Sequence, residues 1–176
     1  AHVHALWHLD FHHGSRKVLT RAGAWATPLM LALIDDHSRL ICHLQWYLAE
    51  SAECFVHGSS QSFAKRGLPR ALMTDGGSAM TAGETEQGLE DLSILHEQTL
   101  PNSPYQNGKI EAFWDQVENR LLPMLDGVAD VSLELLNEAT QAWLELDYNR
   151  RPHDVLARQP PLMRLLQRPD VGRPCP

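Results

Sequence analysis

The chain has 176 residues with a hydrophobic content of 43%, which suits one domain with its own core and is too little for two. Its formal charge of −7 argues against a protein that binds nucleic acid through overall basicity. The charge is uneven, however: residues 84–147 hold 14 acidic and 2 basic side chains, whereas residues 148–176 hold 2 acidic and 6 basic ones. The acidity is confined to one band, so the basic end of the chain could still lie along a phosphate backbone.

Two further features concern the setting of the protein. No apolar run approaches the roughly 20 residues that span a bilayer, so we expect no membrane segment. The three cysteines are an odd number without C-x-x-C spacing, which favours a reducing cytoplasm over a disulfide framework. The chain begins at Ala1 without an initiator Met and soon enters a strand-like run, so we expect a domain excised from a longer protein.

Residues 3–11 alternate with the period of two that is typical of a strand. Three apolar side chains face one way, namely Trp7, Leu9 and Phe11, and three polar ones face the other, namely His8, Asp10 and His12. Asp10 is therefore expected on the polar face of the first strand.

The next two strands are expected at residues 28–34 and 40–48. The first is continuously apolar, as in a strand that is covered on both faces. The cluster between them, residues 35–39, is typical of a turn, so the three strands form an antiparallel meander. The two aspartates of this turn are expected to cap backbone amides, and Arg39 to pair with one of them.

A helix is expected to begin after Ser51 as N-cap and to run to about residue 66, before the stop signal of Gly67. A short strand, residues 70–74, then ends at Asp75, which two glycines follow. Downstream we expect a weak amphipathic helix, a short strand and a loop, at residues 81–92, 93–98 and 100–108.

A helix over residues 109–122 carries Glu111 in its first turn. Its apolar stripe comprises Ile110, Phe113, Trp114, Val117 and Leu121. Pro123 ends or kinks it, and a second helix over residues 132–148 is expected to turn Leu135, Leu136, Ala139, Trp143 and Leu146 inward. In the Pro-rich tail only residues 162–167 are expected to be helical.

Three carboxylates thus occupy positions from which they could converge. Asp10 lies in the first strand, Asp75 at the tip of the fourth, and Glu111 at a helix start, with 35 residues between the last two. In an open mixed sheet, sites gather beyond strand ends where the strand order reverses. Carboxylates suit hard divalent cations, and two such ions about 4 Å apart serve in-line displacement at phosphorus. The pattern predicts metal-dependent phosphoryl transfer on nucleic acid.

At this point the sequence resembles a known family, the catalytic cores of DDE integrases and of bacterial insertion-sequence transposases. The resemblance covers nearly the whole chain and rests on five motifs: Trp7-His8-Leu9-Asp10, Ile34-Asp35-Asp36-His37-Ser38-Arg39, Thr74-Asp75-Gly76-Gly77-Ser78, Ser103-Pro104-Tyr105-Gln106-Asn107-Gly108-Lys109-Ile110-Glu111, and Tyr148-Asn149-Arg150-Arg151-Pro152-His153 with Leu156.

The resemblance implies an α/β, RNase H-like fold: a five-stranded mixed sheet, made of an antiparallel three-strand meander plus two parallel strands, with helices on both faces. Residues 1–150 would form the catalytic core and residues 151–176 a Pro/Arg-rich C-terminal extension. Asp10, Asp75 and Glu111 would be the catalytic triad and the ligands of two Mg²⁺ ions, for which Mn²⁺ can substitute. The gap of 35 residues matches the spacing in the family.

The implied activity is the joining of the 3′-hydroxyl end of a mobile element to target DNA, with end-nicking by water in some members. The implied partners are DNA and further copies, as a homodimer or higher multimer, in a bacterial cytoplasm at the nucleoid. DNA contacts would come from Asn107, Gly108 and Lys109. The family often has a basic residue where this chain has Glu118, so Lys109 or Arg120 would replace that contact.

Other interpretations remain open beside the transferase. One is an RNase H-like nuclease that uses water alone, and another is a domesticated, non-catalytic DNA-binding or assembly module. The intact triad and the motif at residues 148–153 favour the transposase. The ten histidines show no zinc-finger spacing, although His8 and His12 flank Asp10 and could support it. Phe113, Trp114 and Trp143 are expected in the core.

Overall fold

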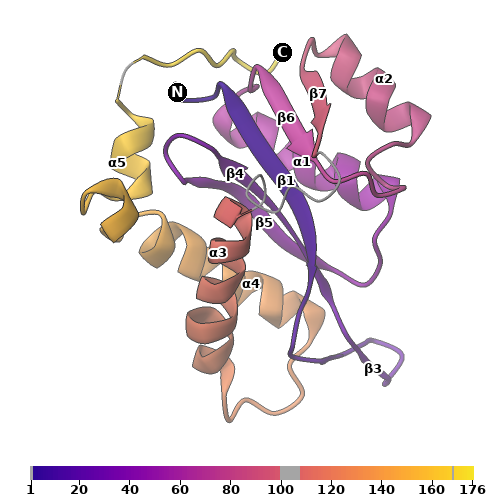
Figure 1. Cartoon of the computed structure of the whole chain (residues 1–176). Coiled ribbons are helices and arrows are strands. Elements are labelled where there is room, and N and C mark those ends of the chain that lie inside the picture. Colours follow the sequence, from indigo (N-terminus) through magenta and orange to yellow (C-terminus); the bar gives the residue numbers. More distant parts are fainter. Residues whose placement is uncertain (1, 100–107, 168) are drawn as a thin grey trace.

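The computed structural model describes residues 2–99, 108–167 and 169–176. Its main feature is a five-stranded sheet in the order β5-β4-β1-β6-β7 (Figure 1). The strands are β1 (Leu6–His13), β4 (Leu29–Asp35), β5 (Ile41–Tyr47), β6 (Ala71–Thr74) and β7 (Leu95–Gln98). β4 pairs antiparallel with β1 and β5, and β6 pairs parallel with β1 and β7. The predicted meander plus two parallel strands is confirmed.

Two details of the sheet differ from the prediction. The first strand begins at Leu6 and not at residue 3, because His4 has a φ of 59° and Ala5 donates to the His2 carbonyl in a turn. A second, two-stranded sheet was not predicted and pairs β2 (Val18–Leu19) with β3 (Trp25–Ala26). Strands of two residues are too short to show a period in the sequence.

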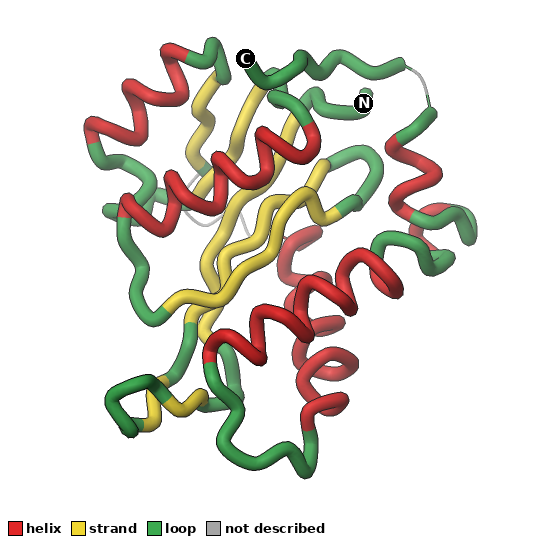
Figure 2. The backbone as a smooth tube through the Cα atoms, turned by 180° about the vertical axis from the view of Figure 1, so that it is seen from behind, coloured by secondary structure: helices red, strands yellow, loops and turns green. Residues whose placement is uncertain are grey.

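Four longer helices cover the sheet, two on each face. α1 (Ala52–Arg66) and α2 (Gly83–Asp91) lie on one face, and α3 (Gly108–Gln116) and α4 (Leu133–Trp143) lie on the other (Figures 1 and 2). The Ser51 side chain caps α1 by accepting from the Cys54 amide at 3.2 Å, and Gly67 ends the helix with a φ of 83°. Helices on both faces were predicted, and this is confirmed.

The core accordingly has two apolar layers. All seven residues of β4 are buried, which confirms that this strand is covered on both faces. Phe113, Trp114 and Trp143 belong to the layer under α3 and α4, as predicted, and Trp7 and Leu9 belong to the layer under α1. The polar side of β1 therefore faces α3 and not open solvent, which brings Asp10 under that helix.

The last turns of α3 and α4 depart from regular α-helix. After Gln116 the chain continues as a π-helix (Val117–Leu121) and a 3₁₀ turn (Leu122–Leu125). After Trp143 a second π-helix follows (Leu144–Tyr148), which adds a residue to the turn and rotates the face beyond it. Leu146 was predicted to point inward and is instead 74% exposed, and Leu135 in the first turn of α4 is 38% exposed. Both of these predictions were wrong.

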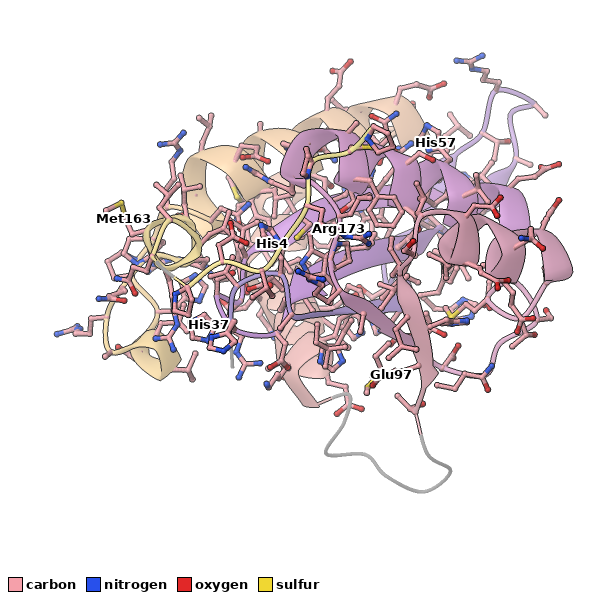
Figure 3. All side chains as sticks on the ribbon, turned by 90° about the horizontal axis from the view of Figure 1, so that it is seen from above. His4, His37, His57, Glu97, Met163 and Arg173 are labelled. Carbon is pink, nitrogen blue, oxygen red and sulfur yellow. The ribbon has the colours of Figure 1, made fainter. Side chains whose placement is uncertain are left out.

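The C-terminal segment returns to the start of the sheet. After a 3₁₀ turn (Asp154–Leu156) and the short α5 (Pro161–Leu165), Val171 donates to the Val3 carbonyl at 3.1 Å. Arg173 and Leu68 exchange backbone hydrogen bonds of 2.7 and 3.0 Å, and this end of the chain passes close to His4 (Figure 3). Within the described residues, no helix combines the length and apolar character needed to cross a membrane.

Candidate active site

The parallel pairing of β1 with β6 brings two of the predicted carboxylates together. His8 is paired with Met73, so the register extended by two residues sets Asp75 beside Asp10. Side chains separated by two residues share a face of the sheet, so both carboxylates point toward the same side. The glycines after Asp75 turn the chain away, which leaves its side chain at the strand end.

The environment of Asp10 is strongly acidic. Burial and the nearby Asp75, with a smaller contribution from Glu50, raise the pKa of Asp10 to about 7. The Trp114 indole of α3 lies beside the Asp10 carboxylate, where it partly opposes this rise in pKa, and the same indole stacks on His12 at a centroid distance of 5.2 Å. His8 binds Asp36 and His12 lies 3.6 Å from Glu118, so support of Asp10 by these two histidines stays a prediction. Like charges that approach without a cation between them disfavour ionisation, and a cation bound there would relieve this.

Glu50 is a third carboxylate at this site, which the sequence interpretation missed. The Gly77 amide donates to Asp75 Oδ1 at 3.0 Å, and a Cβ at Gly77 would lie 3.0 Å from oxygens of both Asp75 and Glu50. Glu50 lies between β5 and the N-cap of α1, outside the strand and the helix that the sequence predicts on either side of it. A carboxylate that follows a strand directly was the available signal. A side chain at position 77 would therefore crowd these two carboxylates.

Glu111 lies in the first turn of α3 and is exposed. It precedes Trp114 by three residues, which places it on the side of the helix that faces Asp10. The structure does not bring it into contact with the other two carboxylates. Within the described ranges, no three His, Cys, Asp or Glu side chains lie close enough together to hold a metal ion. The pair Asp10–Asp75 is therefore assembled, and Glu111 lies apart from it on the covering helix.

The predicted DNA contacts occupy another side of α3. Asn107 lies outside the described residues, whereas Gly108, Lys109 and Arg120 all line one cavity beside the helix. Lys109 pairs with Asp36, to which His8 also binds at 2.9 Å. Burial alone would raise the pKa of Asp36, but the hydrogen bonds from His8 and Lys109 hold it well below its usual range.

Arg120 and Glu118 follow on the same turn and have separate roles. Arg120 pairs with Asp147 and lies over the Trp143 ring at 5.7 Å from its centroid. Glu118 accepts from the Ser15 amide at 3.2 Å and lies 3.6 Å from His12. Glu118 therefore fastens the turn after β1 to α3.

Arg39 does not pair with an aspartate of its turn, and that prediction was wrong. Asp35 accepts from the His4 amide and from the amide and hydroxyl of Ser38, at 2.7 to 2.8 Å. Asp36 is taken by His8 and Lys109. Both carboxylates are engaged by other groups, and no ion pair joins either of them to Arg39 within the described residues.

The donor set fits a divalent cation. Asp10 and Asp75 offer carboxylate oxygens, with Glu50 nearby and Glu111 on the covering helix, and Mg²⁺ and Mn²⁺ prefer such ligands. The raised pKa of Asp10 reflects its burial first and the nearby Asp75 second. A glycine at position 77 leaves room beside these oxygens.

The sheet order and the helices on both faces define an RNase H-like fold. A family model described as "Integrase core domain" matches residues 92–161. The chain is 26% identical over 172 residues to the transposase for transposon Tn552 of Staphylococcus aureus. The match covers 88% of this chain but only 36% of that protein. It thus spans about a third of the length of that relative.

Solved structures of low sequence identity share the fold. A chain of the simian T-cell lymphotropic virus intasome, in complex with a PP2A regulatory subunit, matches with a TM-score of 0.79 and 15% identity over 98% of this chain and 59% of that one. The HTLV-2 integrase catalytic core domain in complex with magnesium, in its dimeric form, matches with a TM-score of 0.74 and 14% identity. That match covers 95% of this chain and 99% of the HTLV-2 chain. The chain thus has the RNase H-like fold of these cores, and part of it resembles an integrase core domain.

Proposed function

We propose that this chain is the catalytic core of a DDE transposase that joins mobile-element ends to target DNA, with Asp10, Asp75 and Glu111 as its acidic triad. The observation that carries the proposal is the pairing of Asp10 with Asp75 at adjacent parallel strands. The similarity to the Tn552 transposase supports DNA as the substrate. Residues 1–150 form the core in this proposal, and residues 151–176 form an extension that packs on it.

The metal ligands follow from the same arrangement. Asp10 and Asp75 would hold two Mg²⁺ ions, for which Mn²⁺ can substitute. Glu111 would complete the set of carboxylate ligands from α3. The ions supply stabilisation of charge on the phosphoryl oxygens and activation of the attacking oxygen. Trp114 of α3 lies beside the half-buried Asp10 and would help to fix its position.

The reaction is a direct transesterification. The 3′-oxygen of the element forms a bond to phosphorus, the bond from phosphorus to the 3′-oxygen of the target strand breaks, and the proton passes from the attacking to the leaving oxygen through solvent. One phosphodiester replaces another, so no nucleophile from the protein is needed. Water in place of the 3′-hydroxyl gives end-nicking.

A strand-transfer assay tests the proposal. The protein that contains this chain is incubated with labelled element ends and a target plasmid in Mg²⁺ or Mn²⁺, beside its Glu111→Gln variant. We expect joined products from the wild type only. Shortened strands without joined products would point to a nuclease that uses water, and DNA binding without either product would point to a non-catalytic module.

A further inference from the structure

A cavity of about 530 Å³ lies beside α3, on the side of the helix turned away from Glu111. Its walls come from three places: the end of β4 with the β4–β5 turn, α3 with the π-helix that continues it, and residues 148–155. The polar side chains that matter for its chemistry are Arg39, Lys109, Arg120, Tyr148, Arg151 and His153. Four of these six are permanently cationic near neutral pH, in a chain whose formal charge is −7.

The charge of this cavity is only partly compensated. Lys109 pairs with Asp36, and Arg120 pairs with Asp147. Asp154 is the acidic group of the lining, and it lies 3.6 Å from Arg158 at the exposed rim. Arg39 and Arg151 have no ion pair within the part of the chain that the structure describes. The cavity therefore retains a positive charge that nothing in the described structure neutralises.

Arg39 is the most informative of these side chains. Its Nη1 atom is buried, and among the described residues no hydrogen-bond acceptor contacts it. A buried guanidinium donor without an acceptor is costly, because the group has lost water and gained no partner. The backbone of the turn fixes the position of Arg39, which has a φ of 62° and whose amide donates to the Asp35 carbonyl at 2.9 Å. The turn thus holds a cationic fork at the cavity wall, ready for an anion.

Two neighbours of Arg39 suit the same ligand. Burial raises the pKa of the Tyr148 phenol well above its usual range, so it stays protonated and keeps a hydrogen to donate. His153 is anchored by its Nε2 atom, 2.9 Å from the Tyr148 carbonyl. A planar guanidinium fork with further donors around it matches the oxygens of a phosphate group.

We propose that this cavity binds a backbone phosphate of the DNA substrate, with Arg39 and Arg151 as its two uncompensated ligands. The assignment to DNA rests on the proposed function, because Lys109 and Arg120 in the same wall are the expected DNA contacts. The site lies across α3 from the acidic residues, so it holds a phosphate other than the one that reacts. Its role is to fix the position of the DNA strand relative to the helix that carries Glu111.

The test is metal-free binding of a short fluorescent duplex, followed by anisotropy in EDTA over a series of salt concentrations. We expect Arg39→Gln and Arg151→Gln each to weaken binding about tenfold and to lower the slope of log K against log salt by about one. Arg21→Gln is the matched control, because this substitution removes the same charge at another place. Arg21 is exposed on the β2–β3 connection and pairs with Glu134. It should bind as the wild type does.

Equal binding by Arg39→Gln, Arg151→Gln and Arg21→Gln would overturn the proposal. So would competition by inorganic phosphate that depends on Arg39 while duplex binding does not. Arg151 is exposed, so we expect Arg151→Gln to fold normally. That variant therefore still tests the proposal if Arg39→Gln lowers the melting temperature too far for a binding measurement. The absence of metal separates this result from catalysis: a protein that shows the expected binding but joins no DNA would refute the proposed function alone.

Discussion

The two sides of α3 have opposite chemistry. Toward β1 the helix presents Glu111 and Glu118, and beneath them lie Asp10, Asp75 and Glu50. Toward the β4–β5 turn it presents Lys109 and Arg120, which line the cationic cavity with Arg39. One helix thus separates a region that attracts cations from one that attracts phosphate. The proposed function needs both, because DNA and its metal ions carry opposite charges, and this arrangement would let a chain with net negative charge bind DNA.

The acidic side is expected to carry the chemistry, and its removal gives the largest effect. Asp10→Asn and Asp75→Asn should each lower the rate of strand transfer by about 10³-fold or more, because bound metal supplies several kcal/mol to the transition state. Strand-transfer rates measure this. Arg21→Gln, which lies outside both regions, should keep the wild-type rate. Comparable rates for Asp75→Asn and the wild type would break the contrast between the two sides.

The carboxylate of Asp10 is expected to destabilise the metal-free fold near neutral pH. The pKa of Asp10 is about 7 when folded and near 3.8 when unfolded, so the folded state binds more protons between these values. Stability from this group is therefore present below about pH 4 and lost as pH rises toward 7. Asp10→Asn should raise the free energy of unfolding at pH 8 by roughly 2 kcal/mol, and by much less at pH 4.

Denaturant unfolding in EDTA at the two pH values measures this effect. Mg²⁺ should stabilise the wild type and leave Asp10→Asn unchanged, because only the wild type has the full ligand charge. A variant less stable than the wild type at pH 8 would show that the acidic pair is not strained in the absence of metal.

Glu50 tests how far the acidic region extends. Its carboxylate lies beside Asp75 at Gly77, so Glu50→Gln should weaken Mn²⁺ binding about tenfold, as is usual for groups just outside a metal's own ligands. Isothermal titration with Mn²⁺ measures this. Glu53→Gln in the first turn of α1 removes a nearby charge and should change little. If both variants bind alike, Glu50 acts only through general charge.

Glu118 gives the smallest effect and separates structure from chemistry on the acidic side. It fastens the Ser15 turn to α3, so Glu118→Ala should lower the free energy of unfolding by about 1 kcal/mol through loss of hydrogen bonds to a charged group. Thermal unfolding checks this, with Glu138→Ala on the exposed face of α4 as control. An undiminished melting temperature together with a large loss of DNA binding would assign Glu118 to the substrate.

Much of this arrangement could be predicted from the sequence, because it depends on short-range patterns. Alternation in β1 set the face of Asp10, the glycines marked the strand tip at Asp75, and the apolar stripe of α3 fixed the side of Glu111. The resemblance to the integrases and transposases supplied the division of the sheet into an antiparallel meander and two parallel strands. These features have a local periodicity or a motif of their own.

The remaining features depend on contacts between distant segments. Leu146 faces outward because a π-helix follows α4 and adds a residue to the helical turn. No residue type in the sequence marks that extra residue. Glu50 joins the site because the connection from β5 to α1 passes beside Gly77. Arg39 was assigned to its neighbours in sequence, whereas His4, His8 and Lys109 occupy those carboxylates from elsewhere in the fold. Competition of this kind is invisible in one sequence.

The position of bound metal tests the central claim most directly. Crystals of the protein soaked in Mn²⁺ should show an anomalous peak between the carboxylates of Asp10 and Asp75, and none in crystals of Asp10→Asn. A peak elsewhere in the molecule, or an unchanged peak in the variant, would contradict the account of the acidic side of α3.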